Sequence, residues 1–271
     1  MDELVVLAAF AHPDDETIFA GGTLAMLVDR GATLHILLAT RGEGGELGEP
    51  PITDRPGLGA IREHELRCAA ESLGATSVLF LDYVDPLVGE DESLHPFKAD
   101  LETLADEIGA AFQATQAQVL ITHGSNGEYG HPAHALMHRA CMLGLQASMG
   151  VSAPLYTVSA SFPEHPKPRL VNKDDPAHFI INIEPWLKIK LQAAECHRTQ
   201  SALFVRRSSQ AAGHPMSLVQ VLMRVESLHR AWPAQDHAAG DPLAVFLRER
   251  CGDALILDTL DSPSGSRLPN N

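Results

Sequence analysis

The stretch FAHPDDETIFAGG, residues 10–22, decides how the rest of the sequence is interpreted. It follows an apolar run at residues 4–10 that is typical of a buried strand, and it leads into an apolar helical stripe over residues 17–30. Between strand and helix stand a histidine, a proline and three consecutive acids, which repel one another unless a positive charge lies among them. We expect a divalent metal ion to supply that charge, with His12 and Asp15 as two of its ligands.

Strand and helix patterns alternate along the first two-thirds of the chain. Further strands are predicted at residues 33–39, 78–81 and 119–122, and further helices at residues 60–73, 97–115 and 132–149. Repeated strand–helix units favour an α/β fold with a mostly parallel sheet and helices on both faces. The loops that follow the strands then gather at the carboxyl ends of the sheet, where such sheets bind ligands.

The alternation weakens after residue 150. Strands are expected at residues 155–158 and 179–183, and a helix is expected from residue 185 to about 198. One further amphipathic helix is predicted, with an apolar face made of Leu218, Val221, Leu222, Val225 and Leu228. The chain contains no internal repeat and is long enough for one large packed domain.

A second polar loop, HGSNGEYGHPAH at residues 123–134, follows the strand at residues 119–122. The sheet topology brings it to the first loop although the two are far apart in sequence. Catalytic zinc takes three protein ligands and keeps one position for water, so His131 or His134 qualifies as the third ligand. Asp14 can take a proton from that water, whose pKa zinc lowers to about 7. The alternative for the first loop is turn chemistry, with an aspartate capping the next helix.

Composition argues against several classes of protein. The 271 residues carry 35 acidic and 20 basic side chains, a formal net charge of −15, which disfavours nucleic acid as a partner. No apolar run approaches the roughly 20 residues of a membrane-spanning helix, and the acidic start is unlike a signal peptide. Cys68, Cys141 and Cys196 lie in helical patterns and are interpreted as small buried side chains in a reduced cytoplasm.

The two histidine loops carry a family resemblance. AHPDDE at residues 11–16 and GHPAH at residues 130–134 resemble the motifs of the PIG-L/LmbE family of zinc-dependent N-deacetylases. Weaker similarities follow in the family's order: TRGE at residues 40–43, Arg62, Glu65, Asp82, and the K…A…H-x-[ST]-Q pattern of residues 190–200. The resemblance divides the chain into a deacetylase-like core, residues 1–200, and a C-terminal extension, residues 201–271, packed on the same domain.

The resemblance implies a Rossmann-like fold, a zinc site and roles for individual residues. His12, Asp15 and His134 fall on the family's zinc ligands, and Asp14 falls on its general base. His131 falls on the histidine that stabilises the tetrahedral intermediate or protonates the leaving amine. Two imidazoles and one carboxylate also accept Fe²⁺, Co²⁺ or Mn²⁺, so these ions remain alternatives to Zn²⁺.

The sequence departs from the family at Ala133, where an aspartate or asparagine often stands between the two histidines. An acid there would orient His131 and raise its pKa. We expect either that Glu128 or Asp82 takes over this function or that the enzyme is slower. Because the ligand residues are intact, catalytic competence is expected.

Four further residues are candidates for contacts with a substrate: Arg41, Glu43, Arg62 and Asp82. A guanidinium suits sugar hydroxyls, carboxylates or phosphates. Surface ion pairs are the alternative for the arginines, and a solvated loop is the alternative for Glu43. His197 and Gln200, in the last family motif, are expected to serve helix packing or hydrogen bonding.

The sequence thus predicts a zinc-dependent hydrolase that removes an acetyl group from an N-acetylglucosamine-type amino sugar or its conjugate. One alternative is a metal-dependent amidase acting on an N-acyl metabolite that is not a sugar. Another is a non-catalytic sugar-binding relative, in which Ala133 marks lost chemistry. The expected partner is a small molecule, and a homo-oligomer is left open.

Overall fold

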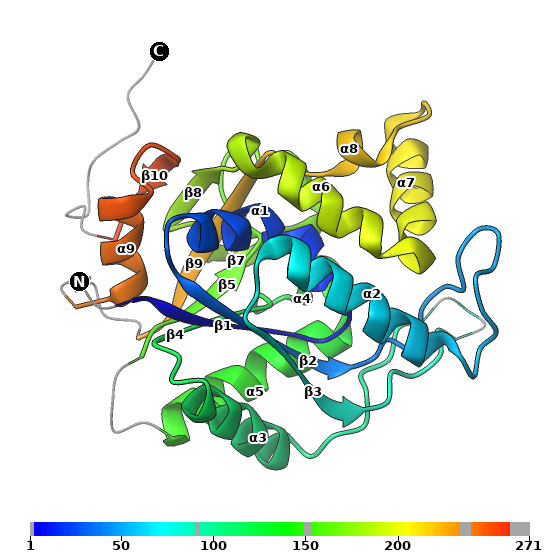
Figure 1. The fold of residues 1–271 in the computed structure, drawn as a ribbon, viewed down its shortest axis with the longest axis horizontal. Coiled ribbons are helices and arrows are strands. Elements are labelled where there is room, and N and C mark those ends of the chain that lie inside the picture. The colour runs from blue at the N-terminus through cyan, green and yellow to red at the C-terminus, as the bar shows by residue number, and fades with distance from the viewer. Residues whose placement is uncertain (1–2, 90, 92, 149–152, 234–239, 261–271) are drawn as a thin grey trace.

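The computed structural model describes residues 3–260 apart from residues 90, 92, 149–152 and 234–239. Its described strands form an eight-stranded sheet in the order β10-β8-β9-β5-β4-β1-β2-β3. The parallel part contains β1 (Val5–Phe10), β2 (Thr33–Thr40), β3 (Ser77–Tyr83), β4 (Val119–Thr122) and β5 (Leu155–Val158). Because 3-2-1-4-5 is the strand order of a Rossmann-like sheet, the predicted fold class is confirmed (Figure 1).

Three strands extend the sheet beyond β5. They are β9 (Val225–Trp232), β8 (Phe179–Asn182) and β10 (Leu255–Asp258), and each runs antiparallel to its neighbour. A small second sheet pairs β6 (Ala160–Ser161) with β7 (Asn172–Pro176). Since β9 lies between β5 and β8, residues beyond 200 contribute an interior strand to the main sheet. The strand order does not test the division of the chain into a core, residues 1–200, and an extension, residues 201–271. That division stays a prediction drawn from sequence similarity.

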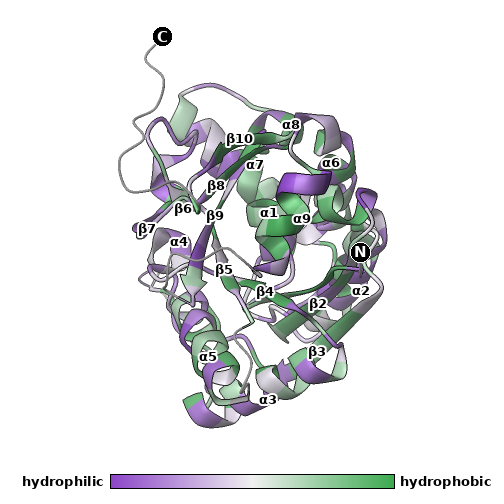
Figure 2. Ribbon diagram, turned by 90° about the vertical axis from the view of Figure 1, so that its left-hand side faces the viewer, coloured by the Kyte–Doolittle hydropathy of each residue, from purple (hydrophilic) through white to green (hydrophobic). Residues whose placement is uncertain are grey.

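Helices cover both faces of the sheet because alternate strand residues point to opposite sides. Val6, Ala8 and Phe10 of β1 pack in the layer of α1 (Asp15–Asp29), α2 (Leu58–Leu73) and α6 (Leu187–Cys196). Leu7 and Ala9 pack in the layer of α3 (Leu101–Ala114) and α5 (Pro132–Ser148). Figure 1 shows these layers above and below the parallel strands, and Figure 2 shows apolar residues concentrated in the strands and α1.

Six further helical elements complete the part of the chain that the structure describes. They are α4 (Gly127–Gly130), η1 (Pro168–Leu170), η2 (Glu184–Trp186), α7 (Arg198–Ala212), α8 (Leu218–Val221) and α9 (Pro242–Arg250). Among the helices of the described residues, none is long and apolar enough to cross a membrane.

Two predictions of helices are corrected by the structure. The amphipathic helix expected to contain residues 218–228 is wrong, because α8 ends at Val221 and Val225 begins β9. β9 has strand neighbours on both edges, so sheet pairing overrides the helical spacing of its apolar residues. The helix expected from residue 97 begins at Leu101, because the Asp100 carboxylate caps it by accepting the Thr103 amide hydrogen at 3.0 Å.

A disulfide joins Cys68 of α2 to Cys196 of α6 across 128 residues of sequence. The prediction that these two cysteines are buried free thiols is therefore wrong: Cys68 is exposed and Cys196 half-buried. Cys141 is a buried free thiol, as expected. Periodicity places the cysteines on helices, but only tertiary packing decides whether two sulfurs meet. The sequence argument for a reducing compartment loses its support.

Reducing the Cys68–Cys196 disulfide is expected to lower the free energy of unfolding by about 2 to 4 kcal/mol, because the cross-link restricts the unfolded chain. The measurement is thermal unfolding followed by circular dichroism, with and without dithiothreitol. The double variant Cys68→Ser, Cys196→Ser is the control and should not respond to the reductant. Equal Tm values for oxidised and reduced wild-type protein would contradict the prediction.

Candidate functional site

The two polar loops meet because β1 and β4 are neighbours in the sheet. Ala9 pairs with Thr122, and the amide of Ala11 donates to His123 Nε2 at 3.0 Å. The chain then turns sharply into α1 through Asp14, whose φ is 108°. The turn places HPDDE of the first loop against GHPAH of the second, as the sheet topology predicted.

Four histidines and one aspartate form a buried cluster between the loops. His12 Nδ1 lies 3.3 Å from Asp15 Oδ2, and His134 Nε2 lies 3.4 Å from Asp15 Oδ1. Ligand atoms lie within 4.8 Å of one another in two overlapping groups: His12, His131 and His134, and Asp15, His123 and His134. The three predicted ligands therefore lie in one cluster, and His134 belongs to both groups.

Hydrogen bonds distinguish the ring nitrogens that are occupied from those that are free. His123 Nε2 accepts an amide hydrogen from the first loop, so its lone pair is occupied. His131 Nδ1 accepts from the Ala133 amide at 3.2 Å, which leaves the hydrogen of the neutral ring on Nε2. His134 Nδ1 lies 2.6 Å from the Glu128 carboxylate, so Nδ1 carries the hydrogen and Nε2 keeps its lone pair. His134 Nε2 is buried without a hydrogen-bond partner in the described chain, which fits a metal ligand.

His12 faces two carboxylates. Its Nε2 lies 3.2 Å from Asp85 Oδ1, while its Nδ1 faces Asp15. Burial opposes the charged form of His12, but Asp85 and Asp15 together raise its pKa to about 10. The two carboxylates thus favour a positive charge at this position, which in the metal-free protein is a proton on His12. The sequence analysis missed Asp85, although an acid two residues after β3, at the same edge of the sheet, was a usable signal.

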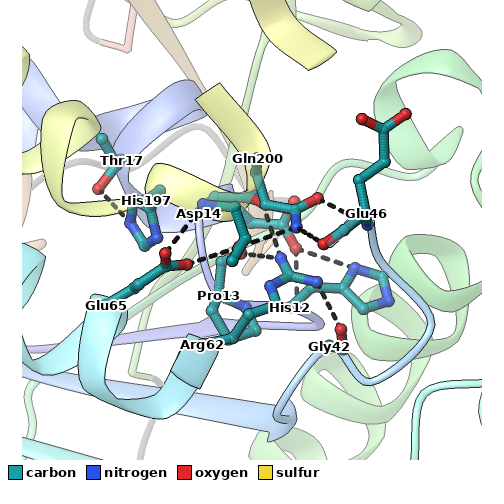
Figure 3. Close-up of polar contacts among 12 residues, drawn as sticks. His12, Pro13, Asp14, Thr17, Gly42, Glu46, Arg62, Glu65, His197 and Gln200 are labelled. Atoms are coloured by element: carbon teal, nitrogen blue, oxygen red, sulfur yellow. Dashed lines mark hydrogen bonds and ion pairs between the residues drawn. The ribbon is translucent and has the colours of Figure 1, made fainter. Parts of the chain in front are cut away.

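Asp14 is held in place from two sides. Arg62 of α2 donates to Asp14 Oδ2 at 2.8 Å and to the carbonyl of Pro13 (Figure 3). Glu16 accepts the Asp14 amide hydrogen at 3.0 Å. Burial raises the pKa of Asp14 to about 7, although the Arg62 guanidinium acts in the opposite direction. A fixed carboxyl group with a pKa near neutrality is suited to general-base catalysis.

Arg62 is buried and engaged within the protein, although it was predicted to contact substrate. Besides Asp14 and Pro13, it binds the Gly42 carbonyl at 2.7 Å. Gly42 has a φ of 68°, and a Cβ there would lie 2.0 Å from Arg62 Nη1. The TRGE loop therefore needs glycine at this position. These contacts favour a role in holding Asp14.

The last family motif supports the same loop from behind. His197 Nε2 lies 3.0 Å from Glu16 Oε1, and Glu16 in turn binds the Asp14 amide. Thr199 donates through its amide and its hydroxyl to the Glu65 carboxylate at 2.8 and 2.6 Å. The junction of α6 and α7 is thereby tied to α1 and α2 (Figure 3).

The remaining predicted substrate contacts lie in the loops after β2 and β3. Arg41 forms ion pairs with Glu63 at 2.6 Å and with Asp82 at 2.5 Å. The Asp82 side chain is 72% exposed. Glu43 accepts the Asp85 amide hydrogen at 3.0 Å and so reaches the cluster through Asp85. Substrate contact by these residues stays a prediction.

The hypothesis that Glu128 or Asp82 replaces the missing acid at position 133 is wrong. Glu128 hydrogen-bonds to His123 and His134, and Asp82 forms an ion pair with Arg41. Burial, with two neighbouring histidines acting in the same direction, lowers the pKa of His131 to about 2. His131 is therefore a neutral imidazole that presents an N–H donor at Nε2.

The fold and the cluster define an α/β protein with a buried histidine–carboxylate centre at the carboxyl ends of its parallel strands. The sequence profile of the PIG-L family, described as GlcNAc-PI de-N-acetylase, matches residues 7–144. The chain belongs to this family. Both histidine loops lie inside the matched range.

Similar proteins include a deacetylase of known name and two solved structures. The 1D-myo-inositol 2-acetamido-2-deoxy-alpha-D-glucopyranoside deacetylase of Thermobifida fusca is 36% identical over 167 residues, which cover 57% of this chain and 58% of the relative. The chain thus spans little more than half the length of this relative.

The solved structures show the fold. The 4-carboxy-2-hydroxymuconate hydratase GalB of Pseudomonas putida has a TM-score of 0.59 at 20% identity, covering 86% of this chain and 98% of its own. The N,N'-diacetylchitobiose deacetylase of Pyrococcus horikoshii has a TM-score of 0.54 at 18% identity, covering 87% and 89%. Since one neighbour is a hydratase and the other a deacetylase, the fold alone does not decide the reaction.

Replacing Arg62 with alanine is expected to lower the free energy of unfolding by about 3 to 5 kcal/mol, because it leaves the Asp14 carboxylate without its buried partner. Urea unfolding measures the change. Arg41→Ala is the matched control: its partner Asp82 is largely exposed, so it should cost less than about 1 kcal/mol. Equal losses in the two variants would show that Arg62 does not compensate a buried charge.

Proposed function

We propose that this protein is a metal-dependent N-deacetylase that removes the acetyl group from an N-acetylglucosamine-type sugar conjugate. The observation that carries the proposal is the buried cluster, in which the free Nε2 of His134 faces Asp15 and the supported carboxylate Asp14 lies in the same loop. Family membership supports the reaction class. The Thermobifida fusca relative, named for a deacetylated N-acetylglucosamine–inositol conjugate, supports the substrate class.

We propose His12, Asp15 and His134 as the metal ligands. The lone pair of His123 is occupied by a backbone amide, and His131 carries its hydrogen on Nε2, so neither competes as a ligand. Two imidazoles and one carboxylate suit Zn²⁺, while Fe²⁺ and Co²⁺ fit the same donor set. When bound, zinc supplies a Lewis acid and a water of pKa about 7.

Asp14 is proposed as the general base. Its carboxylate takes a proton from the attacking water, while Arg62 and Glu16 keep it in one orientation. The Nε2–H group of His131 donates a hydrogen bond to the amide oxygen as that atom gains negative charge, and the ring keeps its proton. The proton held by Asp14 then passes to the leaving nitrogen, so that water and amide become a carboxylic acid and an amine, and the acid loses its remaining proton to solvent. This scheme needs no acid at position 133, because a neutral His131 suffices as the donor.

Asp14→Asn is expected to lower kcat on the order of 100-fold or more, because the amide cannot accept the proton. The assay measures acetate released from N-acetylglucosamine and its inositol conjugate by the zinc-loaded protein. Zinc content should match the wild type, since Asp14 is not a proposed ligand. Glu102→Gln, at an exposed position of α3, is the control. Full activity in Asp14→Asn would refute the assigned base.

Removing the metal with a chelator should abolish acetate release, and adding Zn²⁺ should restore it. The same panel includes N-acyl amides without a sugar, which separates an amino-sugar deacetylase from a general amidase. Hydrolysis that persists after complete metal removal would contradict the metal-dependent mechanism. Binding of the sugar without turnover under any divalent metal would instead favour a non-catalytic protein.

A further inference from the structure

Glu128 has an unusual backbone conformation within the second histidine loop. Its φ is 56° and its ψ is −75°, a left-handed region that side-chain-bearing residues rarely adopt. Such a conformation is unfavourable and persists only where the surroundings fix it. The Glu128 side chain is fully buried. A strained, buried carboxylate beside the cluster requires a structural or chemical reason.

The contacts of Glu128 give that reason. Its Oε2 accepts hydrogens from His134 Nδ1 at 2.6 Å and from His123 Nδ1 at 3.1 Å. Its Oε1 accepts from the Gly124 amide at 2.9 Å and from Asn172 Nδ2 at 3.2 Å. The carboxylate is therefore an acceptor only, and four donors hold it in one orientation.

We infer that Glu128 is a positioning residue for His134, an inference that rests on the proposed metal centre. The carboxylate fixes the hydrogen of His134 on Nδ1, which keeps the Nε2 lone pair directed at Asp15. His123 supports the same ring from the side, because the two imidazoles stack with centroids 3.9 Å apart and planes 15° apart. Glu128 thus selects both the tautomer and the orientation of the ligand.

A purely structural role is the competing explanation. Asn172 of β7 donates to Glu128, and the Glu128 amide donates to Asn172 Oδ1 at 2.9 Å, so Glu128 also connects the second loop to β7. Loss of that connection alone would lower stability without altering the affinity for metal. The two roles are therefore separated by measuring metal affinity and unfolding in the same variants.

The test compares Glu128→Gln and Glu128→Gly with the wild type. Glutamine keeps the volume of the side chain but places an NH₂ group against existing donors, whichever way it is oriented. Glycine removes the carboxylate and also the strain of the positive φ. Asp241→Asn is the control, because Asp241 is a buried carboxylate whose partners, Tyr156 and the first amides of α9, lie outside the histidine cluster.

Zinc affinity is measured by competition with a chromophoric chelator. Both Glu128 variants should bind zinc about 10- to 100-fold more weakly, whereas Asp241→Asn should retain wild-type affinity. Nitrogen-15 NMR of the metal-free protein should show the His134 hydrogen on Nδ1 in the wild type and its loss from that position in Glu128→Gly.

Wild-type zinc affinity in both folded Glu128 variants would overturn the inference, as would an unchanged His134 tautomer. Equal weakening in Asp241→Asn would also overturn it, because any buried carboxylate would then have the same effect. This inference is tested by zinc affinity. The deacetylase proposal fails instead if the zinc-loaded wild type releases no acetate, so the two failures are distinguishable.

Discussion

Several carboxylates are buried at the carboxyl ends of the parallel strands, and each needs a partner that offsets its charge. This requirement determines how the rest of the site is arranged. An ionised carboxylate removed from water is costly unless a partner or hydrogen bonds offset the loss. Arg62 forms an ion pair with Asp14, and His197 pairs with Glu16. The ring N–H groups of His123 and His134 donate to Glu128. Asp15 is left among imidazole rings, one of which presents a lone pair. Asp14, the proposed base, and Asp15, a proposed metal ligand, are neighbours in sequence. Their different partners nevertheless suit them to different roles.

The location of the centre followed from the sequence because strand-end loops converge by topology. HPDDE and GHPAH needed only the adjacency of β1 and β4 to meet. The partner of Arg62 was not predictable, because it depends on how α2 packs against the first loop. The Cys68–Cys196 pair was missed for the same reason: tertiary packing, which has no periodic signature, brings the two sulfurs together. Asp85, in contrast, follows a predicted strand and was within reach of the same strand-end argument. β9 was assigned as helix because its strand pairing is non-local.

The fold supports more than one reaction, and a few residues at one edge of the sheet decide among them. A hydratase and a deacetylase both superpose on this chain at low identity. In this chain the Nε2 atoms of three histidines are in three different states: that of His123 accepts an amide hydrogen, that of His131 carries the ring hydrogen, and that of His134 is free. Those states are set by backbone amides and by Glu128, so the second loop acts as a hydrogen-bonded unit rather than as separate ligands.

The bond between Cys68 and Cys196 closes part of the chain into a covalent ring. The ring contains the second histidine loop, residues 123–134, and excludes the first, residues 10–16. One loop of the centre therefore belongs to the covalent ring and the other does not. The long loop after β3, with its exposed Val84, Leu87 and Val88, belongs to the ring. A protease that cuts this loop produces two fragments that migrate as one species until a thiol separates them. The oxidised protein therefore tolerates a nick in this loop without its fragments coming apart.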